Sequence, residues 1–408
     1  MKRILFFLAL VALMQSCADR NGVVVEVHNP TTKVRMNEMV ELDYSDLLSR
    51  LQLVDTNTVV VLDHSGEQVP YQITHDNKLI FMPAPIEAGM VGQYRVVEGE
   101  PQAYDVRAVG AHYPQRVDDI AWENGCIAFR TYGPALQASG ERAFGYDVWV
   151  KCVDYPVVAD RYADELDPRV LAEIEEFRVT APKVAASLYN TISYHVDHGN
   201  GLDYYKVGPT LGAGTAALLD NNGEIVYPYC YESYEILDNG PLRFTVSLRY
   251  VPFIYNNDTV TECRVITLDE GSQLNKISIK YCGLTAQAPV VSGIVLHDVD
   301  SVMDYSAEAH YAAYAERPDS INGQMFLGMA SAQPVQSVSP CYFDDAERAD
   351  RGAEGHLLMH YLYEPGEELT YYAGAGWSKW GFDNAEDWFV YMRHYSEALA
   401  TPLQVTLR

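Results

Sequence analysis

The chain has 408 residues, of which 30 are tyrosine and 28 are glycine, and a formal net charge of −27 at pH 7. This charge argues against nucleic acid or an anionic membrane face as a partner, because long-range repulsion opposes the encounter. The length exceeds one ordinary core and indicates two domains, while the tyrosine and glycine content favours twisted sheets with many tight turns.

The first residues have the pattern of a secretory signal. Lys2 and Arg3 precede an apolar run of about ten residues, which is too short to span a bilayer stably. The sequence Gln15-Ser-Cys17 then matches a bacterial lipobox, so we expect a signal peptide over 1–16, lipidation of Cys17 and a tether over 17–22. An ordinary cleaved signal with an incidental cysteine is the alternative. The expected location is the cell envelope, with the lipid anchor as the contact with the membrane.

Two regions follow the tether. Residues 23–102 read as a small β module, because short runs rich in Val, Ile and Leu alternate with turn residues. Residues 108–408 are again dominated by strand patterns, and the helical candidates within them are 168–177 and 383–392. Many strands and few helices predict a mainly β protein, with a large antiparallel sandwich after the small module.

Six further cysteines are spread singly along the chain: Cys126, Cys152, Cys230, Cys263, Cys282 and Cys341. Without a CxxC pair this spacing favours free thiols and argues against a cysteine-based metal site. Nucleophile elbows, HExxH motifs, calcium loops and dinucleotide fingerprints are absent from the sequence. We therefore expect no metal and no cofactor, and acid/base chemistry by His, Tyr and carboxylates.

The stretch 194–214 is the densest group of proton-transferring side chains. We predict strand, loop and strand, which would place His195 and Asp197 on one face and His198 on the other. Either histidine is a candidate general acid or base, and the alternative is a histidine that only completes hydrogen bonds in a sheet. The same stretch adds a carboxylate, a phenol and a cation: Asp203, Tyr205 and Lys206.

A second constellation lies on two earlier strands. Alternation places Arg130 and Tyr132 on one face, and Asp147, Trp149 and Lys151 likewise face together. The functional interpretation is a sugar-binding floor of aromatic rings and cations, and the alternative is a solvated sheet face. Further candidates for substrate contact are Tyr146, and Tyr231 and Glu232 in a tyrosine-rich stretch that ordinary sheet packing explains as well. Trp377, Lys379 and Trp380 could form another aromatic and basic wall, although buried packing is the better account of either tryptophan alone.

Several long motifs carry a family resemblance: Asp118-Asp-Ile-Ala-Trp-Glu-Asn124, Gly133-Pro-Ala-Leu136, Gly145-Tyr-Asp-Val-Trp-Val-Lys151, the 194–214 stretch and Gly374-Ala-Gly-Trp-Ser-Lys379. Through them, residues 109–408 resemble a family of Bacteroidota lipoproteins known as a domain of unknown function (number four-eight-six-one), and the preceding module resembles that family's N-terminal part. The resemblance implies a galactose-mutarotase-like β-supersandwich, shared by sugar epimerases, several polysaccharide lyases and domains of glycoside hydrolases. It also implies a setting in glycan utilisation, often of pectin or other uronate-containing polysaccharides.

The leading expectation is a lyase that cleaves acidic, uronate-containing oligosaccharides by β-elimination. The expected roles are base for His195 or His198, acid for Tyr205, and carboxylate neutralisation for Arg130 with Lys206. A mutarotase, epimerase or glycoside hydrolase would instead pair a carboxylate, such as Asp203 or Glu232, with a histidine. A non-catalytic glycan-binding lipoprotein would need only the aromatic floor.

Overall fold

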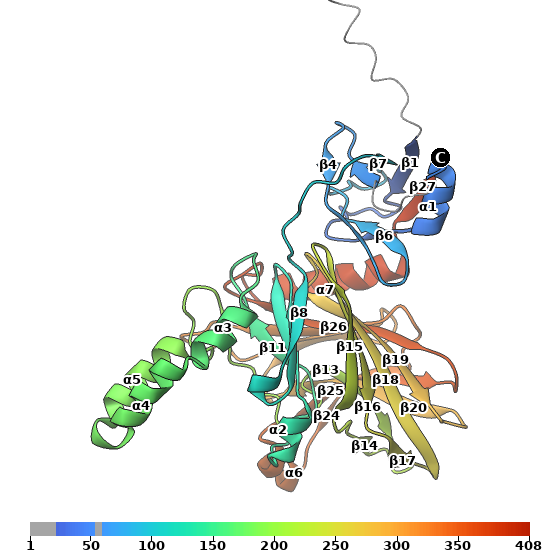
Figure 1. The fold of residues 1–408 in the computed structure, drawn as a ribbon. Coiled ribbons are helices and arrows are strands. Elements are labelled where there is room, and N and C mark those ends of the chain that lie inside the picture. The colour runs from blue at the N-terminus through green and yellow to red at the C-terminus, as the bar shows by residue number, and fades with distance from the viewer. Residues whose placement is uncertain (1–21, 54–58) are drawn as a thin grey trace, which may run out of the picture. The chain divides into compact units, whose positions relative to one another are not determined.

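The computed structural model describes residues 22–53 and 59–408 (Figure 1). The predicted signal peptide and the lipidation of Cys17 lie outside the described residues. Two compact units make up the chain, one up to Asp105 together with Pro402–Arg408, and the other Val106–Thr401. In the described part of the chain, no helix combines the length and the apolar character needed to cross a bilayer.

The first unit contains two antiparallel sheets and one helix. Alternating burial of Val23, Val25 and Val27 shows that β1 turns one face to the core of this unit. The last strand of the chain pairs with β1, although the sequence analysis had assigned residues 402–408 to the larger domain. In sheet order the strands are β27 (Gln404–Leu407), β1 (Gly22–His28), β7 (Val91–Glu98), β3 (Val59–Leu62) and β4 (Gln68–Val69), then β2 (Val40–Asp43), β6 (Lys78–Phe81) and β5 (Tyr71–Ile73), with α1 at Tyr44–Leu51.

The second unit contains three antiparallel sheets, which confirms the predicted mainly β class. The sheet that carries the candidate residues consists of β12 (Leu202–Asp203), β11 (Asp147–Val150), β10 (Ile127–Thr131), β9 (Asp119–Glu123) and β8 (Val109–Tyr113). A second sheet consists of β14 (Ile225–Val226), β13 (Ala213–Leu219), β20 (Ala288–Leu296), β25 (Gly355–Tyr363) and β24 (Ser337–Tyr342). The largest consists of β15 (Tyr231–Asn239), β16 (Arg243–Tyr250), β18 (Asp258–Asp269), β19 (Leu274–Cys282), β26 (Leu369–Trp377), β23 (Met325–Ala330), β22 (Tyr311–Ala315) and β21 (Val302–Ser306), with β17 (Phe253–Tyr255) paired to β18.

The second unit also has more helix than the sequence predicted. Both expected helices form: α4 begins at Pro168 behind the capping carboxylate of Asp167, and α7 begins behind Asn384, whose side chain accepts two backbone N–H groups. The other helices were not predicted. The bounds are η1 (Pro114–Arg116), α2 (Pro134–Ala138), α3 (Val158–Glu165), α4 (Pro168–Thr180), α5 (Pro182–Ile192), α6 (Asp345–Arg351) and α7 (Ala385–Ala400). In Figure 1, α4 and α5 pack on each other as a hairpin that extends away from the sheets.

One large apolar core joins the three sheets of the second unit. Its members come from β9 to β11, from β13, β20 and β25, and from the largest sheet. A smaller cluster packs α7 against β22 and β23 through Trp388, Phe389 and Met392. Burial of this much aliphatic and aromatic surface is the main favourable contribution to folding. The candidate site therefore rests on a rigid scaffold, which can hold polar groups at fixed positions.

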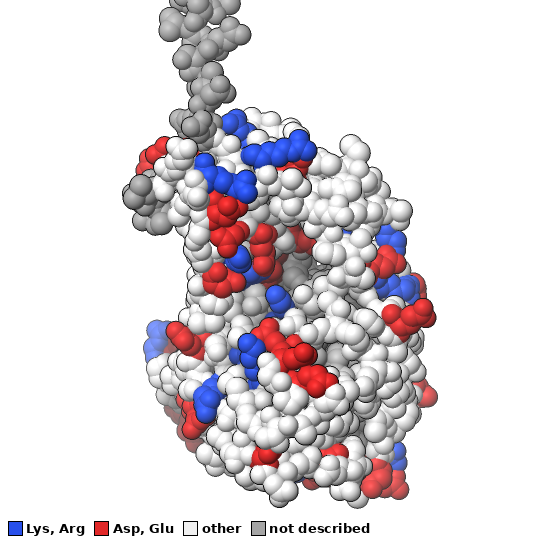
Figure 2. Space-filling view, turned by 90° about the vertical axis from the view of Figure 1, so that its right-hand side faces the viewer, with Lys and Arg blue, Asp and Glu red and all other residues white. Residues whose placement is uncertain are grey.

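The surface charge is mixed rather than segregated where it can be viewed. Figure 2 shows one face of the molecule on which Asp and Glu side chains lie interspersed with Lys and Arg. A net charge of −27 thus coexists with local cations. An anionic ligand would need such local cations to overcome the long-range repulsion.

Candidate functional site

Adjacent strands bring several candidate residues to one face of a sheet. Arg130 on β10 lies opposite Asp147 on β11, and Trp149 lies opposite Asp203 on β12. The predicted common face of Arg130 and Tyr132 is confirmed, since the guanidinium carbon lies 5.1 Å from the centre of the Tyr132 ring. Alternation along neighbouring strands is therefore sufficient to gather these side chains.

This face is covered, contrary to expectation. The ring of Tyr194 stacks on Trp149 at 4.5 Å, and the ring of Tyr162 on α3 meets Trp149 edge-on at 5.2 Å. Trp149 is only 3% exposed as a result. The face is neither an open sugar-binding floor nor a solvated surface, because α3 and the chain after α5, both unpredicted, fold over it.

Under this cover, one guanidinium group meets three carboxyl groups. Arg130 Nη2 donates to Asp203 Oδ2 at 2.8 Å and also to Asp147, while Arg130 Nη1 lies 3.6 Å from Asp119 Oδ2. All four side chains are at most 6% exposed. We call Arg130, Asp119, Asp147 and Asp203 the Arg130 centre. One cation cannot neutralise three carboxylates. Because all of these groups are buried, some of the carboxyl groups are expected to keep their protons.

The pKa values follow from this imbalance. Burial raises the pKa of Asp119 to about 6, against the opposing influence of Arg130. Burial, together with the neighbouring Asp147, raises the pKa of Asp203 well above its ordinary value. Carboxyl groups that retain a proton near neutrality can donate hydrogen bonds and can take part in proton transfer.

Buried polar atoms without a hydrogen-bond partner among the described residues gather around the same centre. They are Asp119 Oδ1, Arg130 Nε and Nη1, Arg116 Nε and Trp149 Nε1. Unsatisfied buried polar groups are rare in folded proteins because each costs about 1–3 kcal/mol of desolvation. Their concentration here is typical of a functional centre rather than of a purely structural network.

His195 lies at the edge of this centre, in a turn and not in a strand. Helix α5 runs to Ile192, so the predicted strand over 194–198 is wrong and the alternation that separated the two histidines does not apply. His195 Nδ1 lies 2.8 Å from the carbonyl oxygen of Asp203, and 52% of its side chain is exposed. Because a carbonyl only accepts, Nδ1 carries the hydrogen, and Nε2 is left as a proton acceptor.

The turn that presents His195 is fixed from several sides. Arg161 Nη2 donates to the carbonyl oxygen of Gly201 at 2.5 Å, and Asp197 Oδ1 accepts from the backbone N–H groups of Gly199 and Gly201. Gly201 has φ +100°, and a Cβ there would lie 1.9 Å from the carbonyl oxygen of Val150. The glycines of this stretch therefore shape the turn.

Arg116 is a second partly exposed group at the centre, and no sequence pattern indicates it. Its guanidinium carbon lies 5.3 Å from the Tyr194 ring centre, and Nη2 donates to Tyr194 OH. Two left-handed residues follow, Val117 at φ +49° and Asp118 at φ +65°, before β9 begins at Asp119. A β-branched residue in this region is strained, and such strain concentrates at functional sites.

Two other candidate groups hold this strained turn. Tyr231 is 3% exposed and its OH donates to the carbonyl oxygen of Asp118. A Cβ at Gly133 would lie 2.0 Å from the same oxygen, so glycine is required for this approach. Tyr231, predicted to contact substrate, instead supports the turn between Arg116 and Asp119.

Lys151 and Tyr146 are placed where no ligand could touch them. Lys151 is 1% exposed and donates to Glu123 Oε2 at 2.7 Å, and Glu123 also accepts the first N–H groups of α3. Tyr146 is 2% exposed, and its OH accepts from Arg264 Nη1 at 2.9 Å. Both side chains therefore have structural roles. Strand alternation predicts which side chains share a face, but not whether that face is open to a ligand or covered.

Tyr205 and Lys206 do not join Arg130 as expected. Tyr205 is 8% exposed, and its ring lies 5.6 Å from the ring of His297. The Nζ of Lys206 points to the carbonyl oxygen of Gly352 at 3.3 Å. Arg130 is itself occupied by carboxylates, so the expected pair of uronate neutralisers is not assembled. Strand β12 ends at Asp203, so Lys206 lies beyond the strand, in the segment that contacts Gly352.

His198 and Glu232 lie apart from the centre. His198 is exposed, and its Nε2 lies 3.1 Å from the carbonyl oxygen of Ser193. Glu232 is 54% exposed and lies 3.7 Å from Arg249. These positions leave His195 as the histidine best placed for chemistry.

Trp377 and Lys379 reach the His195 turn by another route. Trp377 is 1% exposed and donates from Nε1 to the carbonyl oxygen of Asn322 at 2.7 Å. Lys379 Nζ lies 5.0 Å from the Trp377 ring centre and 3.4 Å from Asp197 Oδ2. The 377–381 loop therefore contacts the turn that carries His195.

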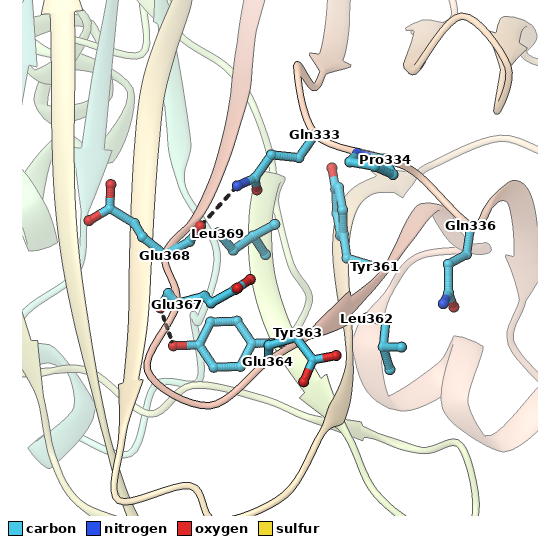
Figure 3. Close-up of a pocket in the computed structure, with 10 residues that line it drawn as sticks. All are labelled: Gln333, Pro334, Gln336, Tyr361, Leu362, Tyr363, Glu364, Glu367, Glu368 and Leu369. Carbon is cyan, nitrogen blue, oxygen red and sulfur yellow. Dashed lines mark hydrogen bonds between the residues drawn. The ribbon is translucent and has the colours of Figure 1, made fainter.

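A pocket of about 280 Å³ lies at the β25–β26 hairpin, away from these residues (Figure 3). Tyr363 OH donates to the carbonyl oxygen of Glu367 at 2.6 Å, and Gln333 Nε2 donates to that of Glu368 at 3.0 Å. No histidine or cation lines this pocket, so it lacks a base paired with an anion-binding group. Within 22–53 and 59–408, no cluster of three His, Cys, Asp or Glu residues has metal-binding geometry.

Some residues of the site that were not among the predicted site residues could have been found from the sequence pattern. Alternation already places Asp147 on a common face with Trp149 and Lys151, without a role of its own, and Asp119 lies inside a family motif at an alternating position that shares the face of Arg130. Counting all charged residues on that face would have revealed the excess of carboxylates. Arg116 and Tyr162 left no such signal, because they reach the centre from a 3₁₀ turn and an unpredicted helix.

A family comparison agrees with the sequence motifs. The family model described as a domain of unknown function (DUF4861) matches residues 27–405. The chain belongs to this family. The uncharacterized protein P7 of Formosa agariphila is similar to this member over nearly all of both chains, with 26% identity over 425 aligned residues, 99% of this chain and 98% of that protein.

A solved structure shares the fold of this DUF4861 chain at low sequence identity. It is an alpha-mannosidase from Enterococcus faecalis, with a TM-score of 0.51 and 8% identity. The alignment covers 96% of this chain and 46% of the mannosidase chain, so the chain spans about half the length of that protein. Such a likeness establishes the fold alone.

Proposed function

We propose that this chain is a carbohydrate-active enzyme that cleaves uronate-containing oligosaccharides by β-elimination. The observation that carries the proposal is His195, half exposed, with Nδ1 fixed by a carbonyl and Nε2 free to accept a proton. Its neighbourhood contains Arg116, a partly exposed cation, and the ring of Tyr194, which contacts both Arg116 and His195. A fold similar to that of a protein named alpha-mannosidase supports action on sugars.

In the proposed reaction, His195 Nε2 removes the proton next to the uronate carboxylate. The electron pair of that C–H bond forms a C=C bond as the glycosidic C–O bond breaks, and the leaving oxygen receives a proton. The negative charge that develops on the carboxylate is stabilised by the positive charge of Arg116. Asp203 acts by positioning the imidazole, since it is buried and touches His195 through its carbonyl.

Tyr132 replaces Tyr205 as the proposed acid. The ring of Tyr132 lies beside Arg130 and is partly exposed, whereas Tyr205 is buried. Burial, and then the negative charge of Asp147, raise the pKa of Tyr132 above its ordinary value. The phenol is therefore protonated at neutral pH, as a proton donor must be before the step.

Glycoside hydrolysis is the second candidate, and the pKa of Asp119 favours it. A carboxyl group that burial holds protonated up to about pH 6 resembles the acid of a hydrolase. Asp119 is 1% exposed, so it would have to act through a neighbour. The two reactions differ in product, because only β-elimination creates a double bond conjugated with the carboxylate.

The test is incubation with a panel of uronate polymers and their oligosaccharides, followed by ultraviolet absorbance and reducing-end assays. The proposal expects both signals to rise together. His195→Ala should lower turnover by about 10²- to 10⁴-fold, and His198→Ala, an exposed histidine outside the centre, is the matched control. Reducing ends without absorbance would select hydrolysis, and no product on the whole panel would refute both reactions.

We also propose that the chain is anchored in the cell envelope through a lipid on Cys17. The lipobox-like Gln15-Ser-Cys17 after a short apolar run supports this. Metabolic labelling with a fatty acid should mark the full chain and should fail for Cys17→Ser. Equal labelling of both, or of neither, would contradict the anchor.

A further inference from the structure

A second pocket, of about 220 Å³, lies where β21 begins and β22 ends. We propose that this pocket, together with the 377–381 loop, is a second sugar subsite that binds a neutral pyranose of the same oligosaccharide. Trp380 would supply its stacking surface. This inference rests on the proposed function, since it extends the His195 centre into a longer cleft.

Hydrogen bonds join the loop to the pocket. Ser378 Oγ accepts from the backbone N–H of Gln324 at 2.8 Å, and Gln324 Nε2 donates to the carbonyl oxygen of Glu316 at 2.8 Å. Gln324 and Glu316 both line the pocket. Gly323 has φ +82°, and a Cβ there would lie 2.6 Å from Ser378 Oγ, so the close approach of the two loops depends on glycine.

The same loop contacts the turn that carries His195. Lys379 Nζ lies 3.4 Å from Asp197 Oδ2, and Asp197 is two residues beyond His195. The loop therefore contacts both the turn that carries His195 and residues that line the pocket. In the proposed subsite, an oligosaccharide bound at His195 extends along this loop.

Trp380 is the tryptophan with an accessible surface. It is 37% exposed, whereas Trp122, Trp149, Trp377 and Trp388 are at most 3% exposed. Trp380 directly follows Lys379. Its backbone N–H donates to the carbonyl oxygen of Trp377 at 3.0 Å, and this hydrogen bond fixes the backbone of the turn. An exposed indole on a fixed turn offers a flat apolar surface to a sugar ring at little cost in side-chain entropy.

The charge of the pocket selects the kind of sugar. Glu316, Asp298 and Asp300 line it, and Glu316 is held in place by His297 and by Tyr314 OH. Arg317, the cation among the lining residues, is 81% exposed and lies 3.5 Å from Asp298. Carboxylates would repel a uronate but accept hydrogen bonds from sugar hydroxyl groups. The favoured ligand has a uronate at Arg116 and a neutral pyranose at the pocket.

The test compares sugars of two lengths on the full chain. Calorimetric titration would use a disaccharide and a hexasaccharide of alternating galacturonate and rhamnose, and a hexasaccharide of galacturonate alone. Trp380→Ala should weaken binding of the alternating hexasaccharide about tenfold and leave the disaccharide unchanged. Tyr342→Ala, which removes another exposed aromatic ring (49%) on β24, is the matched control.

The outcomes separate this inference from the proposed function. Wild-type turnover together with an unchanged Trp380→Ala affinity would overturn the subsite alone. Equal loss for both lengths would also overturn it, because it would indicate damage to the His195 centre. Tighter binding of the pure galacturonate hexasaccharide would overturn the neutral-sugar assignment, and a wild-type protein that neither binds nor cleaves any of these sugars would refute both proposals.

Discussion

His297 Nδ1 lies 2.6 Å from Glu316 Oε1. The other ring nitrogen, Nε2, lies 2.8 Å from the carbonyl oxygen of Lys206. Carboxylate and carbonyl oxygens both accept, so both ring nitrogens donate and the ring is an imidazolium. Through these two hydrogen bonds, His297 connects Lys206, in the chain after β12, with Glu316, which follows the end of β22. The arrangement links the segment that holds Asp203 to the wall of the second pocket.

The first prediction concerns stability and pH. Burial alone would lower the pKa of His297, but the hydrogen bond to Glu316, the negative charge of Glu316 and the contact with the Lys206 carbonyl together outweigh burial, and the net shift is upward. A histidine whose folded pKa exceeds its unfolded value of about 6.5 stabilises fully below that value, and this stability is lost as pH rises through the folded pKa. The affected window therefore begins near pH 6.5 and extends upward.

Urea unfolding followed by tryptophan fluorescence measures this effect, because all five tryptophans lie in the second unit. His297→Gln should lose roughly 2 kcal/mol of unfolding free energy at pH 6, with a smaller loss at high pH. His198→Gln, an exposed histidine in the same unit, is the control. A loss that is equal at all pH values would contradict the imidazolium assignment.

The second prediction uses two glycines of one turn. Gly199 and Gly201 both have positive φ, +92° and +100°, but a Cβ at Gly199 would meet nothing within 4 Å. Gly199→Ala should therefore cost only about 1–2 kcal/mol of backbone strain. Gly201→Ala should cost more and also displace His195, because its Cβ would collide with the carbonyl oxygen of Val150. The readouts are unfolding free energy and turnover, and equal effects would refute the role of this contact.

The third prediction concerns the anion-binding role of Arg116. Arg116→Gln should raise KM for an acidic oligosaccharide by about 10- to 100-fold, as expected for loss of a hydrogen-bonded charge pair. Arg116→Lys should recover part of the lost affinity, because lysine keeps the positive charge but not the planar guanidinium that packs on Tyr194. Arg169→Gln removes a cation that is 88% exposed and serves as the control. An unchanged KM in Arg116→Gln would exclude Arg116 as the carboxylate anchor.

The fourth prediction concerns the Arg130 centre. Arg130→Met removes the cation that three buried carboxyl groups share and should destabilise the second unit by about 3–5 kcal/mol at pH 7. Without the cation the pKa values of Asp119 and Asp203 rise further, so the protonated forms of these two groups become the stable ones. The loss should therefore be smaller at pH 5 than at pH 7. A loss that grows on acidification would show that the carboxyl groups are not the cause.

The sequence predicted features that depend on short-range patterns. The caps before α4 and α7 act within one turn, and alternation on β10 fixes which side chains share a face. The mainly β class follows from the same local preferences. Helix α5 was missed because histidines, glycines and aromatic residues just after it resembled strand and loop, and the helix is held by packing on α4.

Only the tertiary structure decided which polar groups meet. Arg116 contacts Tyr194 across 78 residues, and Arg130 contacts Asp203 across 73 residues. No local pattern encodes such distances, because these contacts form only when the sheet and its cover bury them together. The sequence alone determined the residue types and the strand faces. Burial by α3 and the chain after α5 decided that Lys151 is structural, that Asp119 keeps its proton up to about pH 6, and that His195 faces solvent.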